Sequence, residues 1–390
     1  MPGGMSAQDD AAWAPVRHRF PVLRRQTYLN CAALGPMPDF LLETYQQAVL
    51  ERQHLTPGSA AERARAALAQ YLGVDGASLS FWTNTTQAIN IVAGSIDWRP
   101  GDEVVVNASD FPSNVLPWLR LRDRGVVVRA AALEEGRLPL KAIAAHVTSK
   151  TRLVALSHVL YQTGYRTDLD ALGQFLHQRG IWLSVDGIQA LGLMRPPLDH
   201  VDFYMGASFK HLLGPRGLGL LYVQPQVADA LVPAMVGYAS VALDMDDPAG
   251  LADLVQGRTP LRYREQAGRF QLAHVNTEGL SALADLLSFF DALGWDAIAD
   301  RVLSLSGLAL AGLARLPGVR LVTPQDDAER LSLAVFRVDG WDAHAVVERL
   351  AAHQIVCAAR EGAVRAAFHV YNDASDVERL VMAVRELVGG

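Results

Sequence analysis

Short apolar runs alternate with helix-like patterns along the whole of this 390-residue chain. Three of the runs, at 181–185, 201–205 and 218–223, lie close together and are separated by turn-forming Gly, Pro and Asp. Runs of this length between turn formers are typical of strands buried on both faces of a sheet. We therefore predict three strands of one sheet here. In open α/β sheets, ligands bind beyond the carboxyl ends of such strands.

The same pattern predicts the remaining elements. Further strands are expected at 79–82, 103–109, 126–132, 151–159 and 331–338. Helices are expected at 39–55, 61–72, 279–316 (with its apolar stripe broken at Gly294), about 344–353 and from about 375. The alternation predicts a large doubly wound, mostly parallel α/β domain at 31–278 and a linker helix with a small C-terminal α+β domain at 279–390. Residues 1–30 are predicted to form an N-terminal arm, loose as far as about residue 16.

Composition narrows the class of protein. Half of the residues are hydrophobic and the net charge is −6, without a basic cluster that lacks acidic neighbours, so nucleic acid and anionic membrane are not expected partners. Charges break every apolar stretch before the roughly 18 residues of a membrane span, and the first ten residues are too polar for a signal peptide. Two cysteines, Cys31 and Cys357, are too few for a disulfide framework. These features predict a cytoplasmic protein.

Lysine is scarce enough for one lysine to stand out. The chain has three, and Lys141 and Lys150 bound a polar-punctuated segment, whereas Lys210 is embedded in apolar sequence just beyond the second of the three central strands. Burial lowers the pKa of an amine, which is how a lysine becomes nucleophilic enough to form a Schiff base. A surface lysine that follows a strand is the alternative interpretation.

Asp186 favours the chemical interpretation of Lys210. It ends the first of the three runs, one strand away, and a pyridoxal-phosphate (PLP) enzyme needs such a carboxylate to keep the pyridine nitrogen protonated. Gln189 is a candidate to hydrogen-bond the ring's 3-oxygen, or else a polar residue at the start of a helix. Ser208 is a candidate for a phosphate hydrogen bond.

Thr85 and Thr86 are candidates to hold the cofactor phosphate. They follow the run LSFW and open a predicted helix. Unpaired backbone N–H groups and the positive end of the helix dipole favour an anion at such a position. An ordinary threonine cap is the alternative.

The segments DGIQA and FKHLLGPRGLGLLYV resemble the cofactor core of class V aminotransferases, a fold-type I group of PLP enzymes that includes cysteine desulfurases, kynureninases and isopenicillin N epimerases. Matching pieces recur in order from Tyr28 to the C-terminus. The resemblance implies PLP bound to Lys210, an amino-acid substrate and a homodimer in which each active site is completed by the partner subunit.

The resemblance also assigns individual residues. It implies that Phe111 stacks on the pyridine ring and that Arg365 binds the substrate carboxylate, with Arg360 the weaker candidate. His158 lies at a strand end, and its role is left open. A Gly-Thr pair that in the family reaches the partner's cofactor phosphate is replaced here by Ala273 and His274. We expect His274 or Asn276 to take over that contact.

The spacing of the arginines bears on the reaction. Cysteine desulfurases carry a loop with a nucleophilic cysteine between these two positions, but only 361–364 separate Arg360 from Arg365 here and none of the four is a cysteine. Gln189 and Phe209 depart from kynureninase. We therefore predict reaction at the α-carbon through Lys210, with transamination or epimerisation favoured. The alternatives are a Cβ-cleaving lyase, either kynureninase-like or desulfurase- or selenocysteine-lyase-like without the loop cysteine, and a non-catalytic PLP-binding protein.

Overall fold

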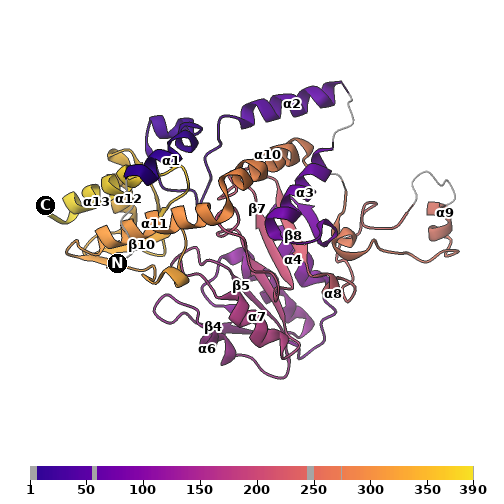
Figure 1. The fold of residues 1–390 in the computed structure, drawn as a ribbon. Coiled ribbons are helices and arrows are strands. Elements are labelled where there is room, and N and C mark those ends of the chain that lie inside the picture. The colour runs from indigo at the N-terminus through magenta and orange to yellow at the C-terminus, as the bar shows by residue number, and fades with distance from the viewer. Residues whose placement is uncertain (1–6, 55–58, 244–249, 274, 390) are drawn as a thin grey trace.

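The computed structural model describes residues 7–54, 59–243, 250–273 and 275–389. Figure 1 shows a large sheet at the centre, helices around it, and a smaller C-terminal unit beside it. The large sheet has the order β2-β8-β7-β6-β5-β3-β4, and every strand is parallel to the others except β8, which is antiparallel to both of its neighbours. Its strands are β2 Leu79–Trp82, β3 Glu103–Asn107, β4 Val127–Ala131, β5 Thr151–Ser157, β6 Trp182–Asp186, β7 Phe203–Ala207 and β8 Gly219–Val223.

The apolar runs of the sequence become the centre of this sheet. Every residue of β3, β7 and β8 is buried, because helices cover both faces. The predicted α/β class with a mostly parallel sheet is thereby confirmed. The helices of this part are α2 Leu41–Gln53, α3 Ala60–Leu72, α4 Thr85–Ser95, α5 Leu116–Leu119, α6 Leu140–Ala144, α7 Leu169–His177, α8 Pro225–Ala228 and α9 Gly250–Val255. Short 3₁₀ turns are η1 Pro21–Arg24, η2 Gly76–Ser78, η3 Pro112–Asn114, η4 Arg120–Arg124, η5 Gln266–Phe270 and η6 Asp327–Glu329.

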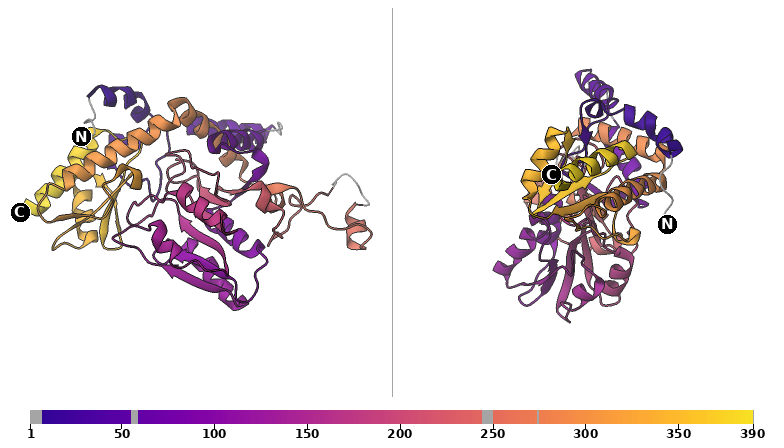
Figure 2. Two further views of the ribbon diagram at one scale, coloured as in Figure 1. Left: turned by 60° about the horizontal axis from the view of Figure 1, so that its bottom comes forward. Right: turned by 90° about the vertical axis from the view of Figure 1, so that its left-hand side faces the viewer.

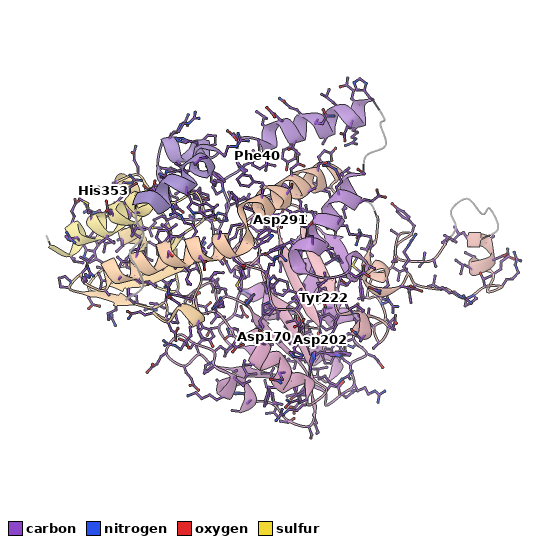
Figure 3. All side chains as sticks on the ribbon, in the orientation of Figure 1. Phe40, Asp170, Asp202, Tyr222, Asp291 and His353 are labelled. Carbon is purple, nitrogen blue, oxygen red and sulfur yellow. The ribbon has the colours of Figure 1, made fainter. Side chains whose placement is uncertain are left out.

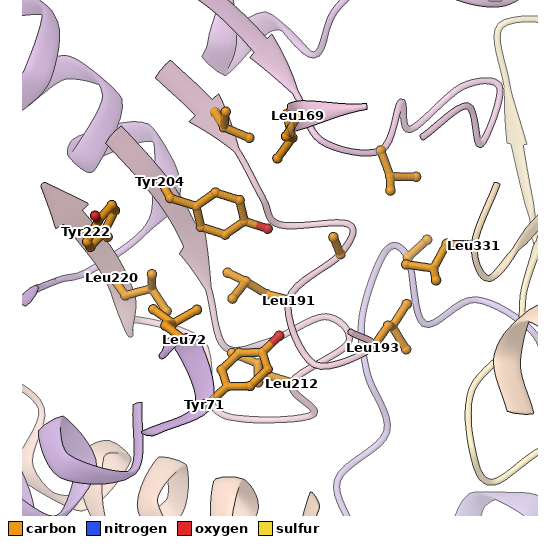
Figure 4. Packing of buried hydrophobic residues seen from close by; sticks show 14 of the residues in the cluster. Tyr71, Leu72, Leu169, Leu191, Leu193, Tyr204, Leu212, Leu220, Tyr222 and Leu331 are labelled. Carbon is orange, nitrogen blue, oxygen red and sulfur yellow. The ribbon is translucent and has the colours of Figure 1, made fainter. Parts of the chain in front are cut away.

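One large apolar cluster fills the space between the sheet and the helices that include α3. Figure 4 shows Tyr204 of β7, Tyr71 of α3 and Leu212 within it. Leu212 lies only two residues after Lys210 and is fully buried. The segment that carries the lysine is therefore anchored in the core.

The C-terminal unit is an antiparallel sheet covered by helices. Its order is β12-β13-β10-β9, with β9 Val319–Leu321, β10 Leu333–Val338, β12 Ala358–Arg360 and β13 Ala363–Ala367. The helices are α11 Trp295–Leu313, α12 Ala343–Ala352 and α13 Ala374–Gly389. In Figure 3 His353 marks this unit, whereas Asp170 and Asp202 lie in the large unit.

The connection between the two parts differs from the single helix that the sequence predicts. It consists of α10 Thr277–Leu293 and α11, which meet at Gly294. Gly294 has a φ of 85°, a left-handed value that a helix cannot contain, so the helix ends there and a new one starts. The break lets α10 pack on α2 and α3 while α11 packs on α13.

The N-terminal arm is not loose over its described length. Residues Ala7–His18 form α1, and Arg17 pairs with Asp376 of α13 at 2.7 Å. Strand β1, Thr27–Tyr28, pairs in parallel with β11, Ile355–Val356. The start of the chain therefore packs on the C-terminal unit before it enters the large one.

Between α8 and η5 the chain projects away from the body as an extended arm that carries α9 (Figures 1 and 2). We call the described residues 232–243 and 250–265 the projecting arm. Several of its large apolar side chains are exposed: Val232, Met235, Val236, Tyr238, Leu251, Val255 and Leu261. Among the described helices, none is long and apolar enough to cross a membrane.

Candidate active site

A cavity of about 280 Å³ lies where the carboxyl ends of β6 and β7 face the C-terminal unit. Loops after β2 and β3 and strand β13 complete its wall. Seven of the eight predicted site residues line it: Thr85, Thr86, Phe111, Asp186, Gln189, Lys210 and Arg365. The structure thus gathers residues that lie up to 280 positions apart in sequence at one edge of the sheet.

Lys210 stands three residues beyond the end of β7. Its ammonium nitrogen lies 5.7 Å from the centre of the Phe111 ring. Burial lowers the pKa of Lys210 to about 8, Asp186 acts in the opposite direction, and the cations of Arg365 and Arg360 lower it further. About a tenth of the amine is therefore neutral at pH 7, far more than for an ordinary lysine.

The Lys210 backbone is held by close packing as well as by hydrogen bonds. Gly35 donates its N–H to the Phe209 carbonyl at 2.8 Å, and a Cβ built on Gly35 would lie 2.1 Å from the Lys210 carbonyl oxygen. No side chain fits between them. The sequence AALGP before α2 is thus a backbone passage that braces the lysine segment.

Asp186 ends β6 and is almost completely buried. One carboxylate oxygen accepts a hydrogen bond from the Ile188 N–H at 3.0 Å. Burial raises the pKa of Asp186 to about 6, and the charge of Asp110 raises it as well. A carboxylate that is shielded from water is strongly stabilised by a cation that contacts its second oxygen.

Gln189 is oriented by two partners. Its amide nitrogen donates to the Ala32 carbonyl at 3.1 Å, and its oxygen pairs with Nε2 of His211 at 2.9 Å. The oxygen is therefore engaged on the protein side, and the second N–H of the amide is the group left to donate to a ligand in the cavity.

The amino end of α4 forms the other end of the cavity. Asn84 caps the helix by accepting from the Gln87 N–H at 2.9 Å, so the first turn of α4 opens toward the cavity. The Thr85 hydroxyl is buried without a partner in the structure. Thr86 donates to the Ser113 hydroxyl at 2.9 Å. A buried, unpartnered hydroxyl at a helix amino end is suited to an anion.

The buried carboxylate of Asp110 holds Phe111 in place next to Lys210. Asp110 accepts hydrogen bonds from the Phe111 N–H, the Asn114 amide and both the N–H and hydroxyl of Ser157. The ring itself is 44% exposed and meets the edge of Tyr161 at 5.4 Å between centroids. Its exposed face is free to cover a planar ligand.

Arg365 reaches the cavity from β13. It is buried, and one terminal nitrogen donates to the Tyr161 carbonyl at 3.1 Å while its Nε has no partner in the structure. Burial lowers the pKa of Arg365 to about 10, and the nearby Arg360 contributes. An arginine with open donors in a dry site is a strong carboxylate ligand. Arg360 also lines the cavity, but it is exposed and donates to the carbonyl of its neighbour Ala359.

The structure does not bring Ser208 to the cavity. Its hydroxyl donates to the carbonyls of Pro215 and Leu218, which close the turn after Lys210. In this rotamer the two carbonyls share the single proton of the hydroxyl, so Ser208 does not donate toward the cavity. Ser208 therefore stabilises the lysine segment instead.

Two residues whose roles the sequence leaves open are used structurally. His158 is buried beside the Tyr204 hydroxyl at 3.1 Å, and burial lowers its pKa to about 3, so it is a neutral core partner of that tyrosine. Asn276 caps α10 by accepting from the Gly279 N–H at 2.8 Å. His274 lies outside the described residues, so the expected phosphate contact across the dimer stays a prediction.

Sequence reasoning missed Tyr161 and Glu361. Tyr161 lines the cavity, and its hydroxyl donates to the Glu361 carboxylate at 3.0 Å. The two residues are 200 positions apart. Tyr161 lies in the spacing His-x-x-Tyr-x-Thr-Gly, but the sequence assigns a role to neither residue. A second cavity of about 730 Å³ lies on the other side of Tyr161 and is lined also by Glu361 and Arg337.

The hairpin between β12 and β13 has a turn of only two residues. Arg360 pairs with Ala363, and the two residues between them, Glu361 and Gly362, have φ values of 48° and 70°. Two positive φ values in a two-residue loop are typical of a type I′ turn. Cys357 is buried before β12, and burial raises its pKa to about 12. No reactive thiol stands on this hairpin.

Known proteins resemble this chain over nearly its full length. The family model for aminotransferase class-V matches residues 34–380. The chain belongs to the aminotransferase class-V family. A probable cysteine desulfurase of Methanothermobacter thermautotrophicus is 28% identical over 96% of this chain and 98% of its own. The crystal structure of the Escherichia coli cysteine desulfurase CsdA matches with a TM-score of 0.84 and 27% identity, over 97% of this chain and 98% of that one.

Class-V membership confirms the predicted family and fold. A C-DES structure in which glycine is covalently linked to the PLP cofactor has the same fold, with a TM-score of 0.86 at 24% identity, over 95% of this chain and 99% of that one. The cofactor predicted from the sequence, PLP, is thus the one carried by this family. The relatives are named as cysteine desulfurases, so they support the lyase alternative better than transamination or epimerisation, which the sequence favoured.

The cavity of this class-V chain fits PLP by its own chemistry. It offers an amine with a lowered pKa, a dry carboxylate opposite it, an exposed aromatic face and a buried, unpartnered hydroxyl at a helix amino end. These are the groups that a pyridine aldehyde with a phosphate requires.

Proposed function

We propose that the chain is a PLP-dependent lyase that cleaves the Cβ–S bond of a cysteine-derived amino acid. We further propose that the sulfur leaves on a small molecule and not on a protein thiol. The observation that carries the first part is the match to cysteine desulfurases over nearly the whole of both chains. The two-residue turn at Glu361 and Gly362 supports the second part.

Each residue has a defined task in this proposal. Lys210 would hold the cofactor, Asp186 would pair with its ring nitrogen, Gln189 would donate to its 3-oxygen, and the amino end of α4 with Thr85 would hold its phosphate. When bound, PLP supplies an electron sink that stabilises negative charge at the substrate Cα. Arg365 binds the substrate carboxylate and so sets which Cα bond faces the lysine.

The lysine then moves the proton. With its pKa near 8, the neutral Nζ of Lys210 accepts the proton from the substrate Cα. The Cβ–S bond breaks and sulfur departs with the electron pair. For cystine the balance is cystine plus water giving pyruvate, ammonia and cysteine persulfide; for cysteine the sulfur product is hydrogen sulfide.

Desulfuration by a protein thiolate gives alanine instead, and the chain is poorly equipped for it. Both cysteines, Cys31 and Cys357, are buried, and burial raises the pKa of each to about 12. The thiolate is the nucleophile, and burial disfavours it at both side chains, which makes either of them a poor acceptor of sulfur from a substrate. The cavity beyond Tyr161 leaves room for a leaving group larger than sulfide.

Product analysis tests the proposal. PLP-loaded protein is incubated with L-cysteine and with L-cystine without added thiol, and pyruvate, ammonia and alanine are measured. We expect pyruvate and ammonia in equal amounts, and the same products from Cys357→Ala. Alanine with a persulfide on Cys357 would show a desulfurase, and keto acid without sulfur release, or racemised substrate, would show the transaminase or epimerase.

A separate test addresses the cofactor. Borohydride reduction should fix PLP covalently on Lys210 in the wild type and in Lys150→Ala, whose lysine is exposed. Lys210→Ala should show no covalent cofactor. A covalent cofactor in that variant would contradict the assignment of the lysine.

A further inference from the structure

Beneath the lysine segment lies a cluster of three side chains that the proposed reaction does not use. One ligand atom from each of Cys31, His211 and His369 lies within 4.8 Å of the others. All three residues are fully buried. They come from three separate parts of the chain, namely the passage before α2, the residue after Lys210 and the end of β13.

Hydrogen bonds determine which nitrogen of each imidazole ring carries the proton. Because the Gln189 amide nitrogen donates to Ala32, its oxygen accepts from Nε2–H of His211. His369 donates its own Nε2–H to the His211 carbonyl at 2.8 Å. A second ring proton on Nδ1 would meet no acceptor within the described part of the chain. Each ring therefore leaves Nδ1 as a bare lone pair, and neither Nδ1 has a hydrogen-bond partner in the structure.

This arrangement is the one that metal-binding histidines adopt. Such a histidine donates its remote N–H to a carbonyl or carboxyl oxygen, which orients the ring and leaves the other nitrogen for the metal. Two fully buried nitrogens without a partner, on rings that cluster with a thiol, are otherwise unfavourable, because a buried polar atom without a partner is destabilising. We propose that Cys31, His211 and His369 bind one soft monovalent cation, Cu(I).

The charge of the cation follows from the surroundings. Cys31 and His211 both feel the positive charges of Lys210 and Arg365. A thiolate with two neutral imidazoles and Cu(I) has no net charge, whereas a divalent ion leaves one positive charge in a buried place beside two cations. Thiolate and imidazole are also suitable ligands for Cu(I).

The binding step is a simple exchange. The Cys31 thiol donates to the Lys210 carbonyl at 3.6 Å and contacts the Tyr371 hydroxyl. Cu(I) replaces the thiol proton, which is released to solvent, and no electron is transferred. Metal–ligand bonds of about 2.0–2.3 Å place three ligands about 3.6 Å apart in a trigonal complex, so the side chains close by roughly 1 Å at most.

The first experiment measures copper in the wild-type holoenzyme. The protein is purified from copper-supplemented cells, and a second sample is incubated anaerobically with Cu(I) and then challenged with a chromophoric Cu(I) chelator. We expect one copper per chain, and X-ray absorption that shows one sulfur and two nitrogen ligands. No retained copper by either route would overturn the proposal, as would zinc retained in preference to copper.

Variants then assign the ligands. Cys31→Ser should lose the copper, and His211→Gln and His369→Gln should weaken its retention on the order of a hundredfold or more. Cys357→Ala and His344→Ala, the latter at an exposed histidine, should keep one copper. Folding of each variant is checked by circular dichroism; if a ligand variant does not fold, the sulfur and nitrogen count in the wild type decides. Copper that depends on Cys357 would overturn the proposal.

Discussion

At the scale of single residues, the proposed chemistry depends on Lys210, whose pKa burial lowers and the charge of Asp186 raises. Lys210 is partly ionised near neutrality because its pKa is lowered to about 8 by burial. Only the neutral amine attacks the PLP aldehyde, and below pH 8 its fraction falls about tenfold per pH unit. We expect the rate of reconstitution of cofactor-free protein with PLP, followed by absorbance, to rise with pH through about 8 and then level off. A rate that is flat from pH 6.5 to 9 would contradict the lowered pKa.

A second prediction at this scale concerns the variant Asp186→Asn. Asp186→Asn keeps the hydrogen bond from the Ile188 N–H, because an amide oxygen accepts as a carboxylate does. Under the proposed function, it removes the negative charge that would hold the ring nitrogen protonated. We expect PLP content near that of the wild type, an altered cofactor absorption spectrum, and activity lower by about 10²- to 10⁴-fold. Activity near that of the wild type would mean that Asp186 does not tune the cofactor.

Much of the site could be predicted residue by residue, but only where the signal was local. Lys210 stood out because lysine is scarce, and Thr85 and Asp186 because each follows a strand. Ser208 does not line the cavity, because its hydroxyl contacts the carbonyls of Pro215 and Leu218 in a turn whose shape the sequence does not specify. Tyr161 was missed because its partner Glu361 lies in the C-terminal unit.

At the scale of elements, the proposed function assigns both substrate recognition and the limit on sulfur chemistry to the β12–β13 hairpin. Arg365 is buried on β13, whereas Arg360 is exposed at the end of β12. A charge-assisted hydrogen bond contributes about 1.5–3 kcal/mol, so Arg365→Ala should raise KM for the amino acid by roughly 10- to 150-fold. Arg360→Ala is the matched control, with a smaller change expected. Steady-state kinetics on the two variants test this prediction. A larger rise of KM in Arg360→Ala than in Arg365→Ala would show that Arg360 binds the substrate carboxylate.

The predicted elements were most accurate where apolar runs were continuous. The strands at β2, β6 and β8 follow such runs almost residue for residue. The N-terminal helix α1 was not expected, because its polar sequence is stabilised by partners far along the chain such as Asp376. Long-range ion pairs of this kind leave no periodic trace in the sequence.

At the scale of the whole molecule, we propose that two copies of the chain associate. The projecting arm exposes several large apolar side chains away from the body of the subunit, an arrangement common at protein interfaces. We expect light scattering to give twice the mass of the chain. Val255→Asp with Leu261→Asp should give a monomer with little activity, while Met382→Asp, at an exposed position on α13, should stay dimeric. A fully active wild-type monomer would exclude the shared site.

The two-residue turn at Glu361 and Gly362 has a consequence for how sulfur would travel in the cell. A loop that carries a persulfide can transfer its sulfur directly to a docked acceptor protein, so the sulfur is never released into solution. The two-residue turn of this hairpin has no cysteine that could carry sulfur from the active site to an acceptor. Under the proposed function, sulfur would instead enter a diffusible pool, and its delivery would depend on concentration and on the lifetime of a free persulfide or sulfide. The acceptor would then be selected by its own reactivity and not by its fit to this protein.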